Sequence, residues 1–170
     1  MKSMLELCDD LPRREFAAQD IVVAEGQTPG ALFILEGGRV EVLKGDVPVN
    51  RVGDPGAVFG EVSVLLNQPA MATVRCLTPC RFRVAADARQ FLAAHPSASW
   101  HLARMLAHRL NGLTHYLVDL KEQFADREDH LGMVDEVLDS LLHHQAGARA
   151  SASSRAPTRS PADDPDSMAG

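Results

Sequence analysis

Short hydrophobic runs separated by turn residues make up the chain between residues 20 and 84. Runs of about four to eight residues that are rich in Val, Ile and Phe, with Gly, Pro, Asn or Asp at their ends, are typical of β-strands. Gly37 and Gly38 separate two of these runs and predict a tight hairpin between them. Many short strands at regular spacing predict an antiparallel β-roll of the double-stranded β-helix or jelly-roll type. The expected strands cover residues 21–23, 31–35, 40–43, 47–52, 71–76 and 81–84.

Helical spacing replaces this pattern after residue 86. Residues 87–94 predict a short helix that has Asp87 as its N-cap and ends before Pro96. From Ser97 to about His143, hydrophobic residues recur every seven positions in two series, which is the pattern of a coiled-coil seam. Only Arg127 interrupts the pattern. The predicted seam comprises Leu106, Leu110, Leu113, Leu117, Leu120, Phe124, Leu131, Val134, Leu138 and Leu141.

This long hydrophobic stripe predicts a parallel homodimer. Between residues 103 and 113 the stripe can instead pack on its own domain, because the roll also needs a cover. Beyond Leu120 the predicted roll is too small to cover it, so we expect a second copy of the chain to do so. The fold class is therefore α+β, a β-roll with flanking helices and a long dimerisation helix. The expected parts are residues 1–96 (the roll with an N-terminal helical segment), 97–145 (the coiled-coil helix) and 146–170.

Composition and charge limit the partners and the location that the protein is expected to have. The chain has 170 residues, and a net charge of −6 without a basic run argues against a nucleic-acid-binding surface. We expect no membrane segment and a cytoplasmic location, because no long apolar run occurs and three cysteines have no disulfide spacing. Residues 146–170 are mostly Ala, Ser, Pro, Arg and Asp, which predicts a disordered tail.

Catalytic and metal-binding constellations are not found in the predicted roll. Cupin enzymes use the same shape and hold a metal with histidines from the strands, whereas this chain has no histidine before His95. We therefore expect no metal and no enzyme activity. Cys76 and Cys80 flank a predicted turn. Buried structural thiols are the favoured interpretation of this pair, and a redox-sensing pair is the alternative.

Residues 58–75 combine a strand end, a glycine, a short helical turn, a loop and a further strand. Gly60 before the helical turn allows backbone amides to approach an anion, assisted by the helix dipole. Glu61 at the start of the turn can accept hydrogen bonds from a sugar hydroxyl.

This segment resembles the phosphate-binding cassette of the cyclic-nucleotide-binding domain found in Crp–Fnr-type regulators, kinase regulatory subunits and gated channels. The resemblance covers about residues 11–120 and includes Gly26, residues 32–37, Gly56, residues 59–61, Pro69 and residues 72–73. In that family the roll binds cAMP or cGMP, and the following helix closes over the base and forms the dimer. The resemblance implies ligand contacts at Phe59, Gly60, Glu61, Val62, Ala70, Met71, Ala72, Thr73, Leu113 and Thr114.

Two departures from the family pattern bear on the ligand. The resemblance places the family's phosphate-pairing arginine at position 70, which is Ala70 in this chain. The small hydroxyl residue that follows that arginine in the family corresponds to Met71. The helix position that faces the base falls on Leu113, beside Thr114. A charge-assisted hydrogen bond is worth about 1.5–3 kcal/mol, so loss of the arginine weakens binding roughly ten- to a hundredfold. We expect cAMP and cGMP to bind poorly or not at all.

Two functions follow from these expectations. The first is a regulatory sensor of a cyclic nucleotide or related small ligand that signals through the dimer helix. The second is a degenerate domain that binds no nucleotide and acts as a dimeric adaptor for a protein partner. Crp–Fnr regulators carry a helix-turn-helix domain after the dimer helix, whereas the residues that follow it here are few and polar. We therefore expect a stand-alone module that does not bind DNA.

Overall fold

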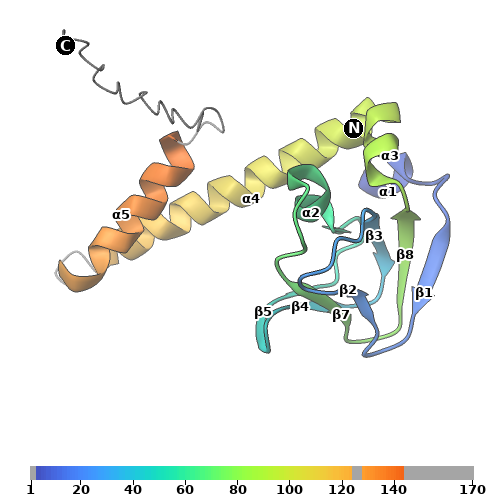
Figure 1. Cartoon of the computed structure of the whole chain (residues 1–170), viewed down its shortest axis with the longest axis horizontal. Coiled ribbons are helices and arrows are strands. Elements are labelled where there is room, and N and C mark those ends of the chain that lie inside the picture. The colour runs from blue at the N-terminus through green and yellow to red at the C-terminus, as the bar shows by residue number, and fades with distance from the viewer. Residues whose placement is uncertain (1–2, 124–127, 144–170) are drawn as a thin grey trace, which may run out of the picture. The chain divides into compact units, whose positions relative to one another are not determined.

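The computed structural model describes residues 3–123 and 128–143. It divides into two compact units, residues 1–113 and residues 114–170, called here the roll unit and the C-terminal unit. The described part of the roll unit contains eight antiparallel strands in two four-stranded sheets, with strand orders β1-β8-β3-β6 and β2-β7-β4-β5 (Figure 1). The predicted α+β fold with an antiparallel β-roll is confirmed. The strands are β1 Arg13–Phe16, β2 Ile21–Val23, β3 Leu32–Gly37, β4 Val40–Lys44, β5 Val47–Val52, β6 Val58–Phe59, β7 Thr73–Cys76 and β8 Cys80–Ala85.

The hairpin predicted at Gly37 and Gly38 is wrong, because β3 and β4 belong to different sheets. Gly38 lies in the connection between them with φ +99°, and a Cβ atom there would lie 2.6 Å from Sγ of Cys80. The two glycines therefore carry the chain past β8 from one sheet to the other. A tight hairpin does follow, between β4 and β5, where Lys44 pairs with Val47.

Strand β3 is buried on both faces. Phe33 and Leu35 point into the space between the two sheets, where Phe82 lies at the centre of the aromatic contacts. Leu32 and Ile34 point the other way and belong to a second hydrophobic cluster that the helices cover. Burial on both faces explains why this strand reads as an uninterrupted apolar run instead of alternating. The helices of this cover are α1 Met4–Leu7, α2 Glu61–Leu66, α3 Ala88–Ala94 and the first part of α4 Pro96–Gln123.

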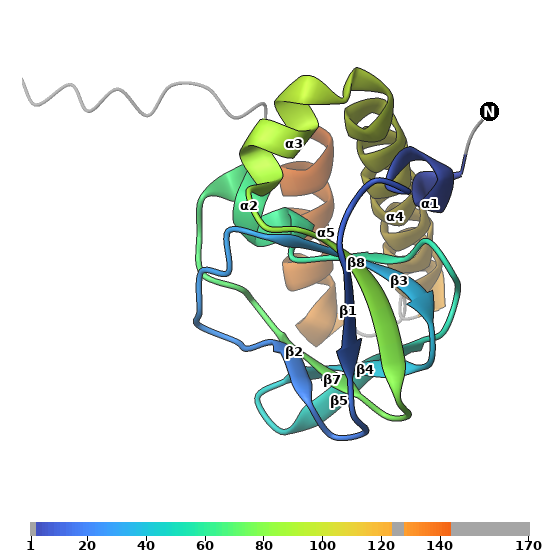
Figure 2. The same cartoon turned by 90° about the vertical axis from the view of Figure 1, so that its right-hand side faces the viewer.

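The helical cover gathers at one end of the roll (Figure 2). Helix α3 agrees with the short helix predicted at residues 87–94, and the carboxylate of Asp87 accepts a hydrogen bond from the N–H of Gln90 at 2.9 Å. The first turns of α4 bury Ala98 and Leu102 in the same cluster. The roll unit therefore extends to residue 113, whereas the sequence placed the boundary at residue 96.

The C-terminal unit contains the end of α4 and a second helix, α5 Glu128–His143. Lys121 on α4 and Asp135 on α5 form an ion pair although they lie 14 residues apart. In one straight helix residues at this separation are about 21 Å apart, so the chain reverses direction between them. The prediction of one continuous helix from Ser97 to about His143 is therefore wrong. Arg127, which interrupts the hydrophobic series, lies in the sequence between the two helices.

The predicted seam residues differ in how far they are covered within one chain. Leu106 is partly buried against the helical cluster of its own roll unit. Leu138 is buried, whereas Leu110 and Leu113 are 45% and 48% exposed. Part of the stripe is thus covered without a second copy, and the homodimer stays a prediction. Leu117, Leu120, Val134 and Leu141 are half-buried, and Phe124, the side chain of Leu131 and the predicted tail at 146–170 lie outside the described residues.

Candidate ligand-binding site

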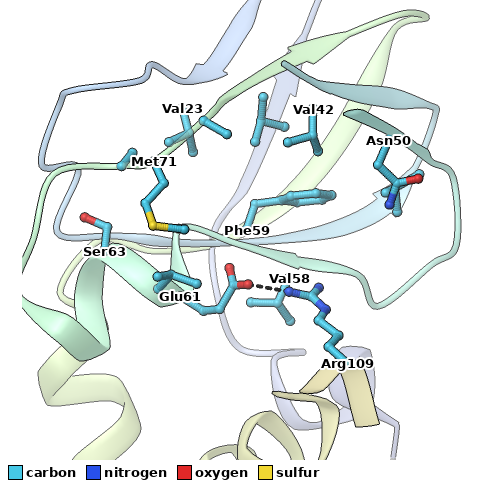
Figure 3. Close-up of a pocket in the computed structure, with 15 residues that line it drawn as sticks. Val23, Val42, Asn50, Val58, Phe59, Glu61, Ser63, Met71 and Arg109 are labelled. Atoms are coloured by element: carbon cyan, nitrogen blue, oxygen red, sulfur yellow. Dashed lines mark hydrogen bonds and ion pairs between the residues drawn. The ribbon is translucent and has the colours of Figure 1, made fainter. Parts of the chain in front are cut away.

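A cavity of about 330 Å³ opens between the sheet that contains β4 and β5, helix α2 and helix α4 (Figure 3). This volume lies at the lower end of the range for small-molecule pockets in proteins. Most of the predicted cassette residues meet there. The lining residues are Val23, Val42, Asn50, Val52, Val58, Phe59, Gly60, Glu61, Val62, Ser63, Ala70, Met71, Ala72, Val74 and Arg109.

Gly60 sets the direction of the chain at the edge of the pocket. Its φ is +86°, and a Cβ atom at this position would lie 2.6 Å from the carbonyl oxygen of Ala31. Glycine is the residue that tolerates both conditions. The sharp change of direction after β6 lets α2 begin at once, with Gly60 as an N-cap that has no side chain. The first N–H groups of a helix have no partner within it, so they stay available to a neighbouring acceptor.

Glu61 is the buried carboxylate of the pocket, and it has an ionic partner on α4. The residue is 5% exposed, and its Oε1 accepts a hydrogen bond from Nη1 of Arg109 at 2.5 Å. Figure 3 shows Arg109 extending from α4 toward this carboxylate. The side chain of Arg109 is half-exposed, so it connects the pocket to solvent. This contact joins the cassette directly to the helix that follows the roll.

Arg109 lines the pocket although the cassette pattern did not predict it. The signal available was its spacing: it lies four residues before Leu113, and residues four apart share a face of a helix. Leu113, predicted to face the base, is 48% exposed and does not line the pocket. Thr114 belongs to the C-terminal unit.

Arg75, the cation nearest to the cassette in sequence, faces away from the pocket. Val42 and Val74 line the cavity, so Glu41 and Arg75 beside them point to the opposite face of the sheet. There Nη2 of Arg75 donates to Oε1 of Glu41 at 2.6 Å. The guanidinium is thus committed to a carboxylate outside the pocket.

Lys44, at the end of β4, holds the loop at Met71 in place. Its Nζ donates to Oε1 of Glu25 at 2.6 Å and to the carbonyl oxygen of Met71 at 2.7 Å. The Lys44 ammonium and, after it, the N–H of Gly45 lower the pKa of the Glu25 carboxyl. The N–H of Glu25 donates in turn to Oγ1 of Thr73 at 3.0 Å, and Thr73 does not line the cavity. Thr73 thus supports the cassette loop from outside the pocket.

Residues 13–94 match the family model described as cyclic nucleotide-binding domain. This part of the chain belongs to that family. The resemblance stated from the cassette residues is therefore confirmed, and so is the roll that it implies.

Relatives of this cyclic nucleotide-binding domain occur in proteins of different kinds. A cAMP-dependent protein kinase regulatory subunit from Yarrowia lipolytica is 39% identical over 59 residues, 35% of this chain and 16% of that protein. The HTH-type transcriptional regulator Cmr from Mycobacterium tuberculosis is 26% identical over 141 residues, 80% of this chain and 58% of that protein. The chain therefore spans less than two thirds of the length of these relatives. The crystal structure of the Thermus thermophilus Catabolite Activator Protein has the same fold, with a TM-score of 0.59 and 21% identity over 68% of this chain and 57% of that one.

Ala70, the position at which the resemblance predicts the phosphate-pairing arginine, lies in the pocket wall of this cyclic nucleotide-binding domain. Ala70 is 8% exposed, and its backbone pairs with the loop before β3: its N–H donates to the carbonyl oxygen of Gln27, and its own carbonyl accepts from Gly26, both at 2.8 Å. Met71 is 59% exposed at the rim. The cassette loop at Ala70 is therefore held in place by backbone hydrogen bonds.

The three cysteines of the chain, Cys8, Cys76 and Cys80, are buried and free. Burial, followed by a hydrogen bond to Cys80, raises the pKa of the Cys76 thiol to about 12. Burial also raises the pKa of the Cys8 thiol to about 11. A thiol that stays protonated at neutral pH reacts slowly, which favours the structural interpretation of Cys76. Among the residues that the structure describes, no group of three or more metal-ligating side chains occurs, and no helix is long and apolar enough to cross a bilayer.

Proposed function

We propose that the chain is a non-catalytic, cytoplasmic regulatory module that binds a cyclic nucleotide or a related small ligand in the roll and transmits the binding state through α4. The contact between Glu61 and Arg109 carries this proposal. A ligand hydroxyl that hydrogen-bonds to Glu61 competes with Arg109 for the same carboxylate. Occupancy of the pocket therefore changes the free energy with which α4 docks on the roll, which is the coupling that a sensor needs.

The output of this sensor is a homodimer formed through α4. Leu110 and Leu113 continue the heptad series and are 45% and 48% exposed in the single chain. Trp100, at the start of the same helix, is 64% exposed. Large apolar side chains that recur along one helix and stay exposed favour an interaction surface. A second copy of the chain supplies the same heptad pattern to cover it.

A second candidate function is a dimeric adaptor that binds a protein partner and no nucleotide. Ala70 and Met71 favour it, because they replace the two side chains that the family uses to hold the cyclic phosphate. The open pocket and the buried Glu61 favour the sensor. The two functions differ in one measurable property, the binding of a ligand in the roll.

Hydrogen exchange on α4 tests the sensor. We expect a ligand found by calorimetry among cAMP, cGMP, adenosine and guanosine to change the exchange of amides in residues 98–113. Arg109→Ala is expected to reduce that change, whereas the exposed Arg89→Ala on α3 serves as a matched control that leaves it intact. Binding without any change in α4 would contradict transmission through this helix, and absence of binding by all four ligands would favour the adaptor.

Sedimentation velocity tests the dimer. We expect the wild-type chain to sediment as a dimer at micromolar concentration, and Leu110→Glu with Leu113→Glu to shift it to a monomer. His108→Glu places a carboxylate at an exposed position of the same helix outside the heptad series and is expected to leave the dimer intact. A wild-type monomer would refute the dimeric output.

A further inference from the structure

We infer that the pocket selects an uncharged nucleoside-type ligand over a cyclic nucleotide. This inference rests on the proposed function, since it names the chemical class of ligand for the same site. It follows from three cations of the described residues, Arg109, Lys44 and Arg75, each of which already has a carboxylate partner.

Arg109 is the one cation among the described residues that line the pocket. Its Nη1 donates to Glu61 at 2.5 Å, so the two charges cancel within the cavity. The two other cations close to the cassette are committed elsewhere. Lys44 pairs with Glu25 at 2.6 Å, and Arg75 pairs with Glu41 at 2.6 Å on the opposite face of the sheet. With alanine at position 70, the pocket has no net positive charge to offer a phosphate.

A cyclic phosphate would therefore enter the pocket without a counter-charge. Burial of an unpaired charge is unfavourable, and the group that could pair with it is Arg109. If Arg109 turned to the phosphate, Glu61, at 5% exposure, would lose its cation. The gain at the phosphate would be offset by the loss at the carboxylate. An uncharged ligand avoids this conflict because it leaves the ion pair neutral.

The remaining polar groups fit hydroxyls and a planar ring system. Glu61 can accept from vicinal hydroxyls beside Arg109, because a carboxylate has several acceptor sites, so such a ligand weakens the contact with Arg109 without removing the counter-charge of Glu61. Oδ1 of Asn50 accepts the N–H of Arg51 at 2.8 Å, which leaves the two N–H donors of its amide for a ligand. Apolar side chains of the opposite wall, including Val42, offer a surface for the rings (Figure 3).

Backbone N–H groups in the cassette are also compatible with an uncharged ligand. Met71 and Ala72 line the pocket beside the start of α2. Their amides can donate to a hydroxyl oxygen as well as to a phosphate oxygen. Hydrogen bonds to a charged acceptor are stronger, yet here they would have to compensate alone for the missing guanidinium. We therefore expect the affinity for a nucleoside to be at least about tenfold higher than the affinity for the matching cyclic nucleotide.

Calorimetry on the full chain tests this order of affinity. Adenosine is compared with cAMP and guanosine with cGMP, at physiological salt, on the wild-type protein. Ala70→Arg is expected to raise the affinity for the cyclic nucleotide about ten- to a hundredfold and to leave that for the nucleoside nearly unchanged. Ala70→Gln adds a side chain of similar length without the charge and is the matched control. Circular dichroism of each variant reports whether it folds.

The outcomes separate the inference from the function on which it rests. Tighter binding of the nucleoside than of the cyclic nucleotide by the wild-type protein supports the inference, even if the variants at position 70 do not fold. Equal or tighter binding of the cyclic nucleotide overturns the inference and leaves ligand sensing in place. Absence of binding by both classes overturns the inference together with the sensor, and the adaptor becomes the better account.

Discussion

The ion pair between Glu61 and Arg109 predicts an asymmetric response to mutation. Arg109→Ala removes the cation from a carboxylate that is 5% exposed, and none of the other described residues that line the pocket is cationic. Breaking a fully buried pair costs about 3–5 kcal/mol and an exposed pair about 0–1 kcal/mol. Since the side chain of Arg109 is half-exposed, we expect a loss of about 1–3 kcal/mol in the free energy of unfolding.

The reverse change is expected to be milder. Glu61→Gln keeps a carbonyl oxygen that accepts from Arg109, and the half-exposed guanidinium can also reach water. We expect a loss of about 1 kcal/mol or less. In the background of Arg109→Ala, Glu61→Gln removes a buried charge that has lost its partner. The double variant is therefore expected to be more stable than Arg109→Ala alone.

Urea denaturation followed by circular dichroism at neutral pH measures all four proteins of this cycle. Arg89→Ala, an exposed arginine on α3, is the matched control and is expected to stay within about 0.5 kcal/mol of the wild type. If Glu61→Gln destabilises Arg109→Ala further, the carboxylate is well solvated without its partner. That result would refute both the buried ion pair and the charge balance assigned to the pocket.

Three further outcomes are expected. Cysteines in place of Lys121 and Asp135 should form a disulfide within one chain, seen as a faster-migrating monomer on a non-reducing gel, whereas interchain cross-links would indicate a straight parallel coiled coil. Gly60→Ala should lower the free energy of unfolding by about 1–3 kcal/mol, because φ is +86° and the new Cβ atom would meet a backbone carbonyl. Gly112→Ala, on the open surface of α4, is the control and should raise the free energy of unfolding by about 0.5–1 kcal/mol. Equal effects of the two substitutions would contradict the strain at Gly60. The pKa of Glu25 is lowered in the folded protein, so its carboxylate contributes stability above the ordinary pKa of 4.5, and this stability is lost as the pH falls through the lower folded pKa. The urea midpoints of the wild type and Glu25→Gln should therefore converge as the pH is lowered. A difference between the two midpoints that does not change with pH would refute this prediction.

Local patterns in the sequence were sufficient for the elements of the roll. Strand β5 and helix α3 were found because alternation, turn residues and the Asp87 cap act over a few neighbouring positions. The cassette was found for the same reason, since Gly60, Glu61 and Ala70 lie within one short segment. Pairing between strands is a different matter. Gly37 and Gly38 predicted a hairpin from the sequence, yet the chain passes close to Cys80 there and connects two strands that belong to different sheets.

Local sequence patterns were enough to predict the antiparallel roll, the contiguous cassette and alanine at position 70, where the family resemblance predicts an arginine. Which cation enters the pocket depends on the packing of distant segments. Arg109 lies 48 residues from Glu61, and only the docking of α4 on the roll brings the two together. Heptad spacing likewise continues through Leu138, although the contact between Lys121 and Asp135 requires the chain to reverse. Periodicity records which face of a helix is apolar, whereas the surface that covers that face depends on contacts between distant residues.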